Sequence, residues 1–446
     1  MRRRFTRGLS LLFMSVIVVG AVSASACGAT APTSIYVAVN GNDANSGTAA
    51  APVITFERAY QLARPGQTVR VTAGDYPYQR LVADGAKRGT AKVFFKPAVG
   101  ATVNVSLIDF GQGQFGVLGP HDVKVQDMNV TYLRAWAGTR AVTWENIHGQ
   151  HFDVFDAVDL RVVGGVYGPC QAPRDDPACV SRIAGTATGI IVDGVTIQGV
   201  TSTDLANYHV DGLMIRGCTS CTVRNSRFLR NMITNIRVQN QACCINQNLT
   251  IENNWFGPAL QGNNSSTRFD GIDVDDPVPG LLVRMNSFAP GTGLQLIGSY
   301  SDARVVGNLL SNATCAAGVR YAYNVYVPFS PYTGQAPCGR TEKKVRALEY
   351  ANPAQFDYHV TARSPGFRLV PSAYCARSDI DGHKRFRGFN CDAGADEQPK
   401  ALLCHRVKPN HPRHVTIAVI RSRLAAYLKH GDALGRCRPS TASRKP

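Results

Sequence analysis

One short strand recurs four times in the middle of this chain, as Gly212-Leu-Met-Ile-Arg216, Asn235-Ile-Arg-Val-Gln239, Gly271-Ile-Asp-Val-Asp275 and Gly293-Leu-Gln-Leu-Ile297. In each copy, apolar and polar residues alternate with the period of a half-buried β-strand. Turn-forming Gly, Asn and Asp residues separate the copies. Such repetition favours a solenoid, because each repeat buries its apolar side by stacking on its neighbours.

A second repeated strand follows each copy and contains a polar corner. The four segments are Val223-Arg-Asn-Ser-Arg-Phe228, Ile251-Glu-Asn-Asn-Trp-Phe256, Val283-Arg-Met-Asn-Ser-Phe288 and Val305-Val-Gly-Asn-Leu-Leu310. Their first position is Ile or Val, their sixth is Phe or Leu, and their fourth is in turn Ser226, Asn254, Asn286 and Asn308. An Asn at a tight bend tolerates the left-handed conformation and can hydrogen-bond the next coil. We therefore predict a buried ladder of these fourth residues beside stacked apolar columns.

Both ends of this region resemble a known superfamily. The stretch from Ile35 to Thr48, the helical pattern over 55–63 and the turn Pro65-Gly-Gln-Thr68 look like the opening of secreted right-handed parallel β-helix (pectin-lyase-like) proteins. The stretch from Asp357 to Glu397 is similar to their closing segment. The resemblance implies an all-β, right-handed parallel β-helix over residues 34–397. It also implies that the helix covers the open N-terminal end of the solenoid.

The C-terminal residues 400–438 change in composition. Cys404-His405, the run from Val415 to Leu428 and His430-Gly-Asp432 before Cys437 resemble a small module appended to many secreted bacterial proteins. The apolar period over 415–429 is helical. We expect residues 439–446 to be a disordered tail.

Two interpretations of this module stay open. A disulfide between Cys404 and Cys437 would close a core that is too small to be stable by itself. Alternatively, Cys404, His405, His430 and Cys437 would bind zinc in a tetrahedral site.

The N-terminus predicts export. Arg2, Arg3, Arg4 and Arg7 precede an apolar run, and Ala24-Ser-Ala26 offers a small-residue cleavage site, so residues 1–26 have the features of a signal peptide. Cys27 leaves lipid acylation open as an alternative. We expect a secreted, extracellular protein, with cell-surface association as an open possibility.

The net charge of +17 is uneven along the chain. Residues 398–446 contain eleven Lys and Arg residues against one acid, Asp432, whereas residues 28–397 are nearly neutral. A nearly neutral body argues against a nucleic-acid partner. The basic tail would instead contact anionic cell-surface polymer. We expect a monomer.

Thirteen cysteines suit an oxidising compartment, since twelve remain after Cys27. Four local disulfides are expected, namely Cys170–Cys179, Cys315–Cys338, Cys375–Cys391 and Cys404–Cys437. Two further bonds between coils, Cys218–Cys243 and Cys221–Cys244, are favoured as staples. Pairing within Cys218-Thr-Ser-Cys221 is the rival.

The outward positions of the repeated strands carry the candidate chemistry. Alternation places His209, Asp211, Arg237, Asp270 and Asp273 on one exterior face as candidate catalytic residues. Arg216, Arg268, Asp275 and Gln295 would bind substrate there. Asp211 and Asp270 would lie two coils apart, at roughly 10 Å, slightly beyond the roughly 6.5–9.5 Å of an inverting glycosidase pair.

Other uses of this face stay open. Asp273, Asp275 and Asp276 would suit a calcium ion as a cofactor of this face. Stacked charged residues can also pair with one another as a solvated surface. No complete active site of the polygalacturonase or pectate lyase type is present.

The sequence therefore leaves three functions open. The first is cleavage of a polysaccharide, anionic or neutral, by a lyase or glycoside hydrolase. The second is carbohydrate binding or cell-surface attachment without catalysis. The third is a structural envelope protein.

Overall fold

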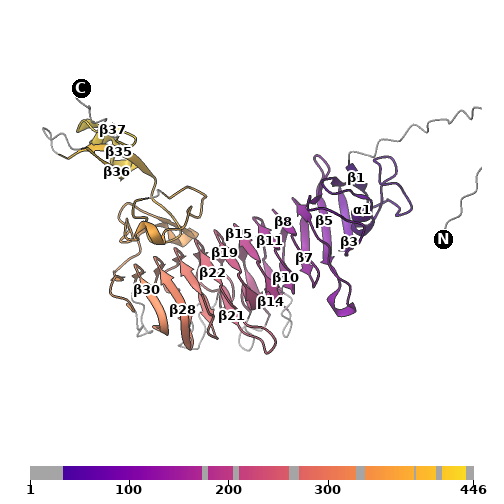
Figure 1. Cartoon of the computed structure of the whole chain (residues 1–446), viewed down its shortest axis with the longest axis horizontal. Helices are drawn as coiled ribbons and strands as arrows, with labels where there is room; N and C mark the ends of the chain where they lie inside the picture. The colour runs from indigo at the N-terminus through magenta and orange to yellow at the C-terminus, as the bar shows by residue number, and fades with distance from the viewer. Residues whose placement is uncertain are drawn as a thin grey trace, which may run out of the picture. The chain divides into compact units, whose positions relative to one another are not determined.

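In the computed structural model, the strands of successive coils lie side by side in parallel and form long sheets (Figure 1). The structure describes residues 34–172, 179–203, 210–260, 271–327, 337–385, 388–407 and 414–437. The predicted signal peptide and the predicted C-terminal tail lie outside these ranges. The fold is the expected all-β, right-handed parallel β-helix.

The coils have three faces. On each face, the strand of one coil lies beside the strand of the next coil. Face 1 is a sheet of twelve strands. They are β1 (Ser34–Val37), β2 (Thr68–Val71), β4 (Val93–Pro97), β6 (Val123–Gln126), β8 (Thr143–Glu145), β11 (Arg161–Val163), β15 (Ile191–Asp193), β19 (Thr222–Arg224), β22 (Thr250–Glu252), β25 (Leu282–Arg284), β28 (Ser299–Val306) and β30 (Ala317–Ala322).

Face 2 follows face 1 in each coil. It consists of β9 (His148–Gly149), β12 (Val166–Tyr167), β16 (Thr196–Gln198), β20 (Arg227–Leu229), β23 (Trp255–Phe256), β26 (Ser287–Phe288), β29 (Leu309–Leu310), β31 (Val325–Tyr326) and β32 (Lys343–Lys344).

Face 3 completes the coil and carries the predicted site. It consists of β10 (His151–Phe155), β14 (Ser181–Thr188), β18 (Leu213–Thr219), β21 (Ile236–Gln239), β24 (Ile272–Val274) and β27 (Leu294–Leu296). In the first coils, the long strands β3 (Gly74–Leu81), β5 (Val103–Phe110) and β7 (Asn129–Ala135) run from face 2 into face 3. The short strands β13 (Cys170–Ala172) and β17 (Val200–Ser202) pair with each other.

The predicted ladder is confirmed at the corner between faces 1 and 2. Asn254 Oδ1 accepts from the Ser226 amide at 2.9 Å, Asn286 Oδ1 accepts from the Asn254 amide at 2.9 Å, and Asn308 Oδ1 accepts from the Asn286 amide at 3.0 Å. The ladder continues to Asn324, and its members are fully buried. Beside it, the ring of Phe256 packs 5.3 Å from Phe228 and 4.7 Å from Phe288, measured between centroids.

The left-handed conformation lies one residue before the predicted position. Asn225, Asn253, Met285 and Gly307 have φ values between 53° and 68°, whereas the ladder residues do not. The preceding residue therefore makes the turn. This frees each ladder side chain to point inward and bond along the stack.

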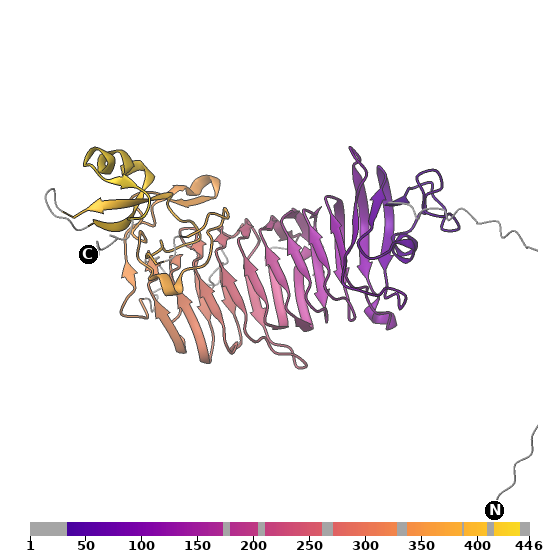
Figure 2. The same cartoon turned by 45° about the horizontal axis from the view of Figure 1, so that its top comes forward.

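The predicted capping helix is present as α1 (Phe56–Leu62), at the N-terminal end of the coils (Figure 2). Thr55 caps it, because its hydroxyl accepts from the Arg58 amide at 3.1 Å. Phe56, Ala59 and Tyr60 are buried against the first coils.

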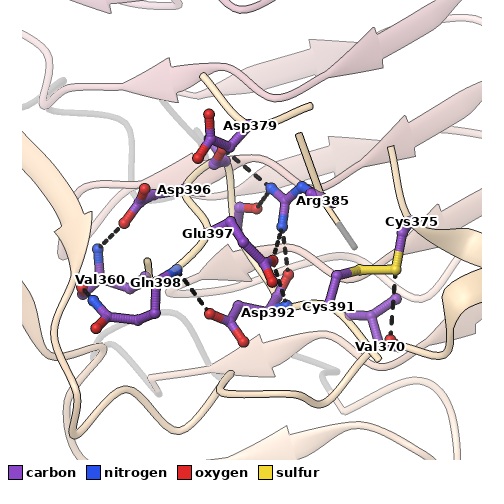
Figure 3. A network of polar contacts seen from close by, with 12 residues as sticks. Val360, Val370, Cys375, Asp379, Arg385, Cys391, Asp392, Asp396, Glu397 and Gln398 are labelled. Atoms are coloured by element: carbon purple, nitrogen blue, oxygen red, sulfur yellow. Dashed lines mark hydrogen bonds and ion pairs between the residues drawn. A yellow bond between two sulfur atoms is a disulfide. The ribbon is translucent and has the colours of Figure 1, made fainter. Parts of the chain in front are cut away.

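The closing segment packs on the outside of face 2. Its antiparallel strands β33 (Tyr350–Asn352) and β34 (Asp357–Val360) belong to a second apolar core, which includes Trp255, Met285 and Leu309 of the coils. A buried ionic network lies within the closing segment (Figure 3), where Arg385 bonds Glu397 at 2.7 Å. The segment is tied to the coils by the Ala395 amide, which donates to Ser287 Oγ at 2.9 Å.

The C-terminal residues form a small antiparallel sheet. It contains β35 (Lys400–Arg406), β36 (His414–Ile420) and β37 (Ala433–Leu434), with the helix α2 (Leu424–Lys429) between the last two. The helical prediction over 415–429 is thus wrong in its first half, where β-branched Val415, Thr416 and Ile417 pair with β35 instead. Short 3₁₀ helices lie at Gly113–Phe115, Pro353–Gln355, Ser372–Tyr374 and Arg421–Arg423. In the described ranges, no helix is long and apolar enough to cross a membrane.

Four disulfides pair as expected, namely Cys170–Cys179, Cys315–Cys338, Cys375–Cys391 and Cys404–Cys437. The two bonds between coils, Cys218–Cys243 and Cys221–Cys244, are wrong. The structure pairs Cys218 with Cys221 and Cys243 with Cys244. Cys218 and Cys221 are buried in the core, whereas Cys243 is exposed on a turn closed by Gln241 and Cys244.

The ladder predicts a sharp difference between two asparagines. Asn286→Ala should lower the free energy of unfolding by about 3 kcal/mol, because it removes the acceptor of the Asn254 backbone and side-chain amides and the donor to the Ile251 carbonyl. The matched change Asn104→Ala, on an exposed hydrogen-bonded Asn, should cost no more than about 0.5 kcal/mol. Chemical denaturation followed by circular dichroism measures both, and equal effects would show that the ladder does not stabilise the coils.

Candidate functional site

A row of alternating charge runs along the outside of face 3 and its long first strands. We call it the outer row, and each member is the Cα partner of the next in the parallel register. Its members are Arg80, Asp109, Arg134, Asp153, Arg182, Met214, Arg237, Asp273 and Gln295. Neighbouring strands lie about 4.8 Å apart, so opposite charges meet along the row.

The first half of the outer row is neutralised by bidentate pairs. Arg134 donates to both carboxylate oxygens of Asp109, at 2.6 and 2.7 Å. Arg182 likewise bonds both oxygens of Asp153, one of them at 2.7 Å, and Asp153 also accepts from Tyr132. Both aspartates are buried. Such pairs hold the two ions in a fixed geometry and leave little net charge.

The alternation breaks at Met214, and a cluster rich in carboxylates follows. Arg237, on the next coil, donates to Asp275 Oδ2 at 2.8 Å and lies in the field of Asp211 and Asp273. Asp211 is 0% exposed and Asp273 is 5% exposed. Carboxylates withdrawn from water beside a cation are a feature of functional sites as well as of structural ion pairs.

Electrostatics fixes the protonation state of Arg237. Burial acts to lower the pKa of its guanidinium, but Asp211, Asp275 and Asp273 outweigh that effect and raise the pKa above its ordinary value. Arg237 therefore keeps its proton and cannot serve as a general base. It remains suited to binding an anion or a hydroxyl oxygen.

The structure brings together most of the predicted residues that it describes. Asp211, Arg237, Asp273 and Asp275 form the cluster, and Arg216 reaches it through Gln239, to whose Oε1 it donates at 2.8 and 3.1 Å. Gln295 follows Asp273 in the outer row. Asp211, expected on the exterior face, is buried and lies near enough to Arg237 to raise its pKa. It precedes the bend at Gly212, where strand alternation does not yet apply. His209, Arg268 and Asp270 lie outside the described residues.

Two of the three carboxylates considered for calcium accept hydrogen bonds from other groups. Asp275 Oδ2 accepts from Arg237 and from Gln239, and Asp276 Oδ2 accepts from the Asn240 amide at 2.8 Å. Among the described residues, Asp273, Asp275 and Asp276 are not one of the groups whose ligand atoms converge.

An aromatic shelf beside the outer row was missed by the sequence argument. Trp136 and Phe155 stack with 4.9 Å between ring centroids, and both remain partly exposed. Arg134 lies 5.2 Å from the Trp136 ring centroid, and Arg182 lies 5.4 Å from that of Phe155. The signal in the sequence was an aromatic residue two positions after Arg134 and after Asp153, which lie before the repeats that begin at residue 209.

A hollow at the N-terminal end of the outer row was also missed. It has a volume of about 440 Å³, and it is lined by Asp43, Thr55, Glu57, Arg58, Gln61, Tyr78, Gln79 and Arg80. Arg80 is both a wall of this hollow and the first member of the row.

A second polar cluster lies on the closing segment. His359 bonds Asp381 through Nε2 at 2.7 Å and Asp357 through Nδ1 at 2.5 Å. The Asp381 hydrogen bond, opposed by burial and aided by Asp357, raises the pKa of His359 to about 9. Burial raises the pKa of nearby Asp396 to about 6. At neutral pH and without a bound metal, His359 is thus an imidazolium that donates hydrogen bonds to Asp357 and Asp381.

Comparisons with known proteins agree with the coiled fold. Residues 185–328 match the family model "Right handed beta helix region", and residues 39–81 match "Protein of unknown function (DUF1565)". No curated protein matches the chain.

Several solved structures are similar at low identity. One is a rhamnogalacturonan lyase, at 11% identity and a TM-score of 0.41, with 72% of this chain and 90% of that chain covered. Another is the pectate lyase Pel9A, at 13% identity and a TM-score of 0.41, with 83% and 97% covered. A third is the A-module of an Azotobacter vinelandii mannuronan C-5 epimerase, at 9% identity and a TM-score of 0.28, with 63% and 90% covered. Likenesses this distant say nothing about the reaction of this chain.

The His359 cluster predicts a pH dependence of stability. Because the folded pKa of about 9 exceeds the unfolded value of 6.5, its stabilising effect is complete below pH 6.5 and is lost as the pH rises through 9. The side chain is 39% exposed, so we expect a loss of only about 1 kcal/mol. Denaturation midpoints measured from pH 6 to pH 10 should fall more in the wild type than in His359→Asn. Parallel curves for the two proteins would show that His359 does not contribute.

Proposed function

We propose that this chain is a carbohydrate-active protein that binds a polysaccharide along the outer row and cleaves it at the cluster around Arg237. The observation that supports this best is the break in the row at Met214. There the neutral Arg–Asp pairing stops, and the buried carboxylates of Asp211 and Asp273 lie on the coils before and after Arg237.

The cluster suits hydrolysis better than elimination by an arginine base. Glycosidases use two carboxyl groups, one on each side of the scissile bond. Asp211 and Asp273 occupy coils two strand spacings apart, about 10 Å along the stack, and their side chains can shorten that gap. Arg237 stays protonated, so its role would be to hold a sugar oxygen or carboxylate. We retain His209 and Asp270 as proposed catalytic partners, and Arg216, Arg268, Asp275 and Gln295 as proposed substrate-binding residues.

The aromatic shelf would supply further binding subsites. Sugar rings present apolar C–H faces, which pack on exposed aromatic rings, while Arg134 and Arg182 beside the shelf offer donors to hydroxyl or carboxylate oxygens. A chain of sugars lying across the coils would thus reach from the shelf to the Arg237 cluster. Secretion, supported by the six disulfides, would bring the protein to such a substrate.

Binding without catalysis is the second candidate function. The paired charges of Asp109–Arg134 and Asp153–Arg182 favour it, because fixed ion pairs present a rigid surface that has no free acid or base. The basic C-terminal residues would then help to hold the protein on anionic cell-surface polymer.

Cleavage is tested by a panel of polysaccharides that includes rhamnogalacturonan, pectate, alginate and neutral glucans. We expect new reducing ends without new unsaturated ends, and Asp273→Asn should lower the rate at least a hundredfold. The matched control Asp302→Asn alters an exposed aspartate on face 1 and should leave the rate unchanged.

Other results of that panel would replace this proposal. Unsaturated ends would mean elimination. Binding without cutting would establish the second candidate function. A panel with neither binding nor cutting would contradict both.

The shelf makes a separate prediction about affinity. Trp136→Ala should weaken polysaccharide binding about five- to tenfold, because one ring–sugar contact is lost. Tyr374→Ala, which removes an exposed aromatic of the closing segment, should not change it. Affinity electrophoresis of the two variants compares them directly, and equal retardation would show that the shelf does not contact sugar.

A further inference from the structure

Two histidines and one aspartate meet in the C-terminal residues, far along the chain from the Arg237 cluster. His405 lies on β35, His430 follows α2, and Asp432 precedes β37. One ligand atom from each lies within 4.8 Å of the other two. The proposed polysaccharide function uses none of these residues.

Backbone pairing holds the three residues together. The strand β37 pairs with β35 through Leu403–Leu434 and Cys404–Ala433, which places Asp432 beside His405 and Arg406. The Arg406 amide donates to Asp432 Oδ1 at 2.9 Å, and Asp432 Oδ2 bonds His405 Nδ1 at 2.9 Å. The disulfide Cys404–Cys437 closes the same sheet, with 4.6 Å between its Cα atoms.

The burial of Asp432 contrasts with the openness of the histidines. The Asp432 side chain is fully buried, whereas His430 is exposed and its ring nitrogens bond no residue that the structure describes. The His405 and His430 rings lie 6.2 Å apart, nearly parallel, and they line a hollow of about 190 Å³ together with Ala426 and Tyr427. A buried carboxylate at the base of an open pair of imidazoles leaves room for a cation between them.

The histidines of the C-terminal cluster differ from His359 in the hydrogen bonds of their ring nitrogens. There, both ring nitrogens are taken by carboxylates and the imidazole is held protonated. In the C-terminal cluster one histidine has a single carboxylate bond and the other has none to the described residues. Neutral imidazole is the form that binds metals.

We propose that His405, His430 and Asp432 bind one divalent transition-metal ion, with zinc as the reference metal. Two imidazole nitrogens and a carboxylate oxygen suit a borderline metal of this kind, and three protein ligands leave a position open for water or for a ligand from a partner. The sulfur atoms of Cys404 and Cys437 are joined to each other, so they are unavailable as thiolates. The zinc set of Cys404, His405, His430 and Cys437 expected from the sequence is thereby corrected.

The test is equilibrium dialysis of the untagged full-length protein against zinc chloride. We expect one zinc ion per chain, removable by a chelator. His430→Ala, at an exposed position where the fold should tolerate it, should weaken binding at least tenfold. His414→Ala removes an exposed histidine of the neighbouring strand β36 and should leave the affinity unchanged.

X-ray absorption of the zinc-loaded protein provides a second readout. We expect only nitrogen and oxygen neighbours, at about 2.0–2.1 Å. Sulfur at about 2.3 Å would mean that Cys404 and Cys437 bind the ion as thiolates, which would overturn the proposal. It would also be overturned by the absence of saturable zinc binding, or by equal affinity of His430→Ala and the wild type.

Discussion

Polar groups buried at the corner between faces 1 and 2 must find partners inside the coil stack, and the Asn ladder supplies them. Each ladder side chain accepts from the amide of the residue one coil away and donates back along the stack. This repeated bond fixes the register of successive coils. Once register is fixed, every inward and outward position of a coil lies directly over its counterpart in the next.

The outer row is the external consequence of that register. Stacking at about 4.8 Å would set like charges against one another, yet Arg and Asp alternate from Arg80 to Arg182, and bidentate pairs neutralise the row. Met214 ends this alternation. Beyond it, Arg237 lies in the field of three carboxylates, Asp211, Asp275 and Asp273, on the same framework of stacked coils. The framework explains why the proposed binding and reacting parts lie on one face.

The sequence was sufficient for what repeats and insufficient for what occurs once. The aligned repeats predicted the ladder and the stacked Phe residues, because each occupies one position in every repeat. The local sequence predicted the helix α1. The burial of Asp211 and the disulfide between Cys243 and Cys244 depend on bends between strands. There, the alternation of a strand does not predict which way a side chain points. The meeting of His405 with Asp432 could not be predicted, because it depends on the pairing of β35 with β37 across 27 residues.

The central claim is that a polysaccharide lies along the outer row, and hydrogen exchange of the protein with its bound polysaccharide tests it most directly. The claim predicts slower exchange in peptides that cover residues 129–136, β10 and β21, which contain Trp136, Phe155 and Arg237. Face 1 should exchange at the same rate with and without the ligand. Protection confined to face 1 or to the C-terminal strands, with none on face 3, would contradict the claim.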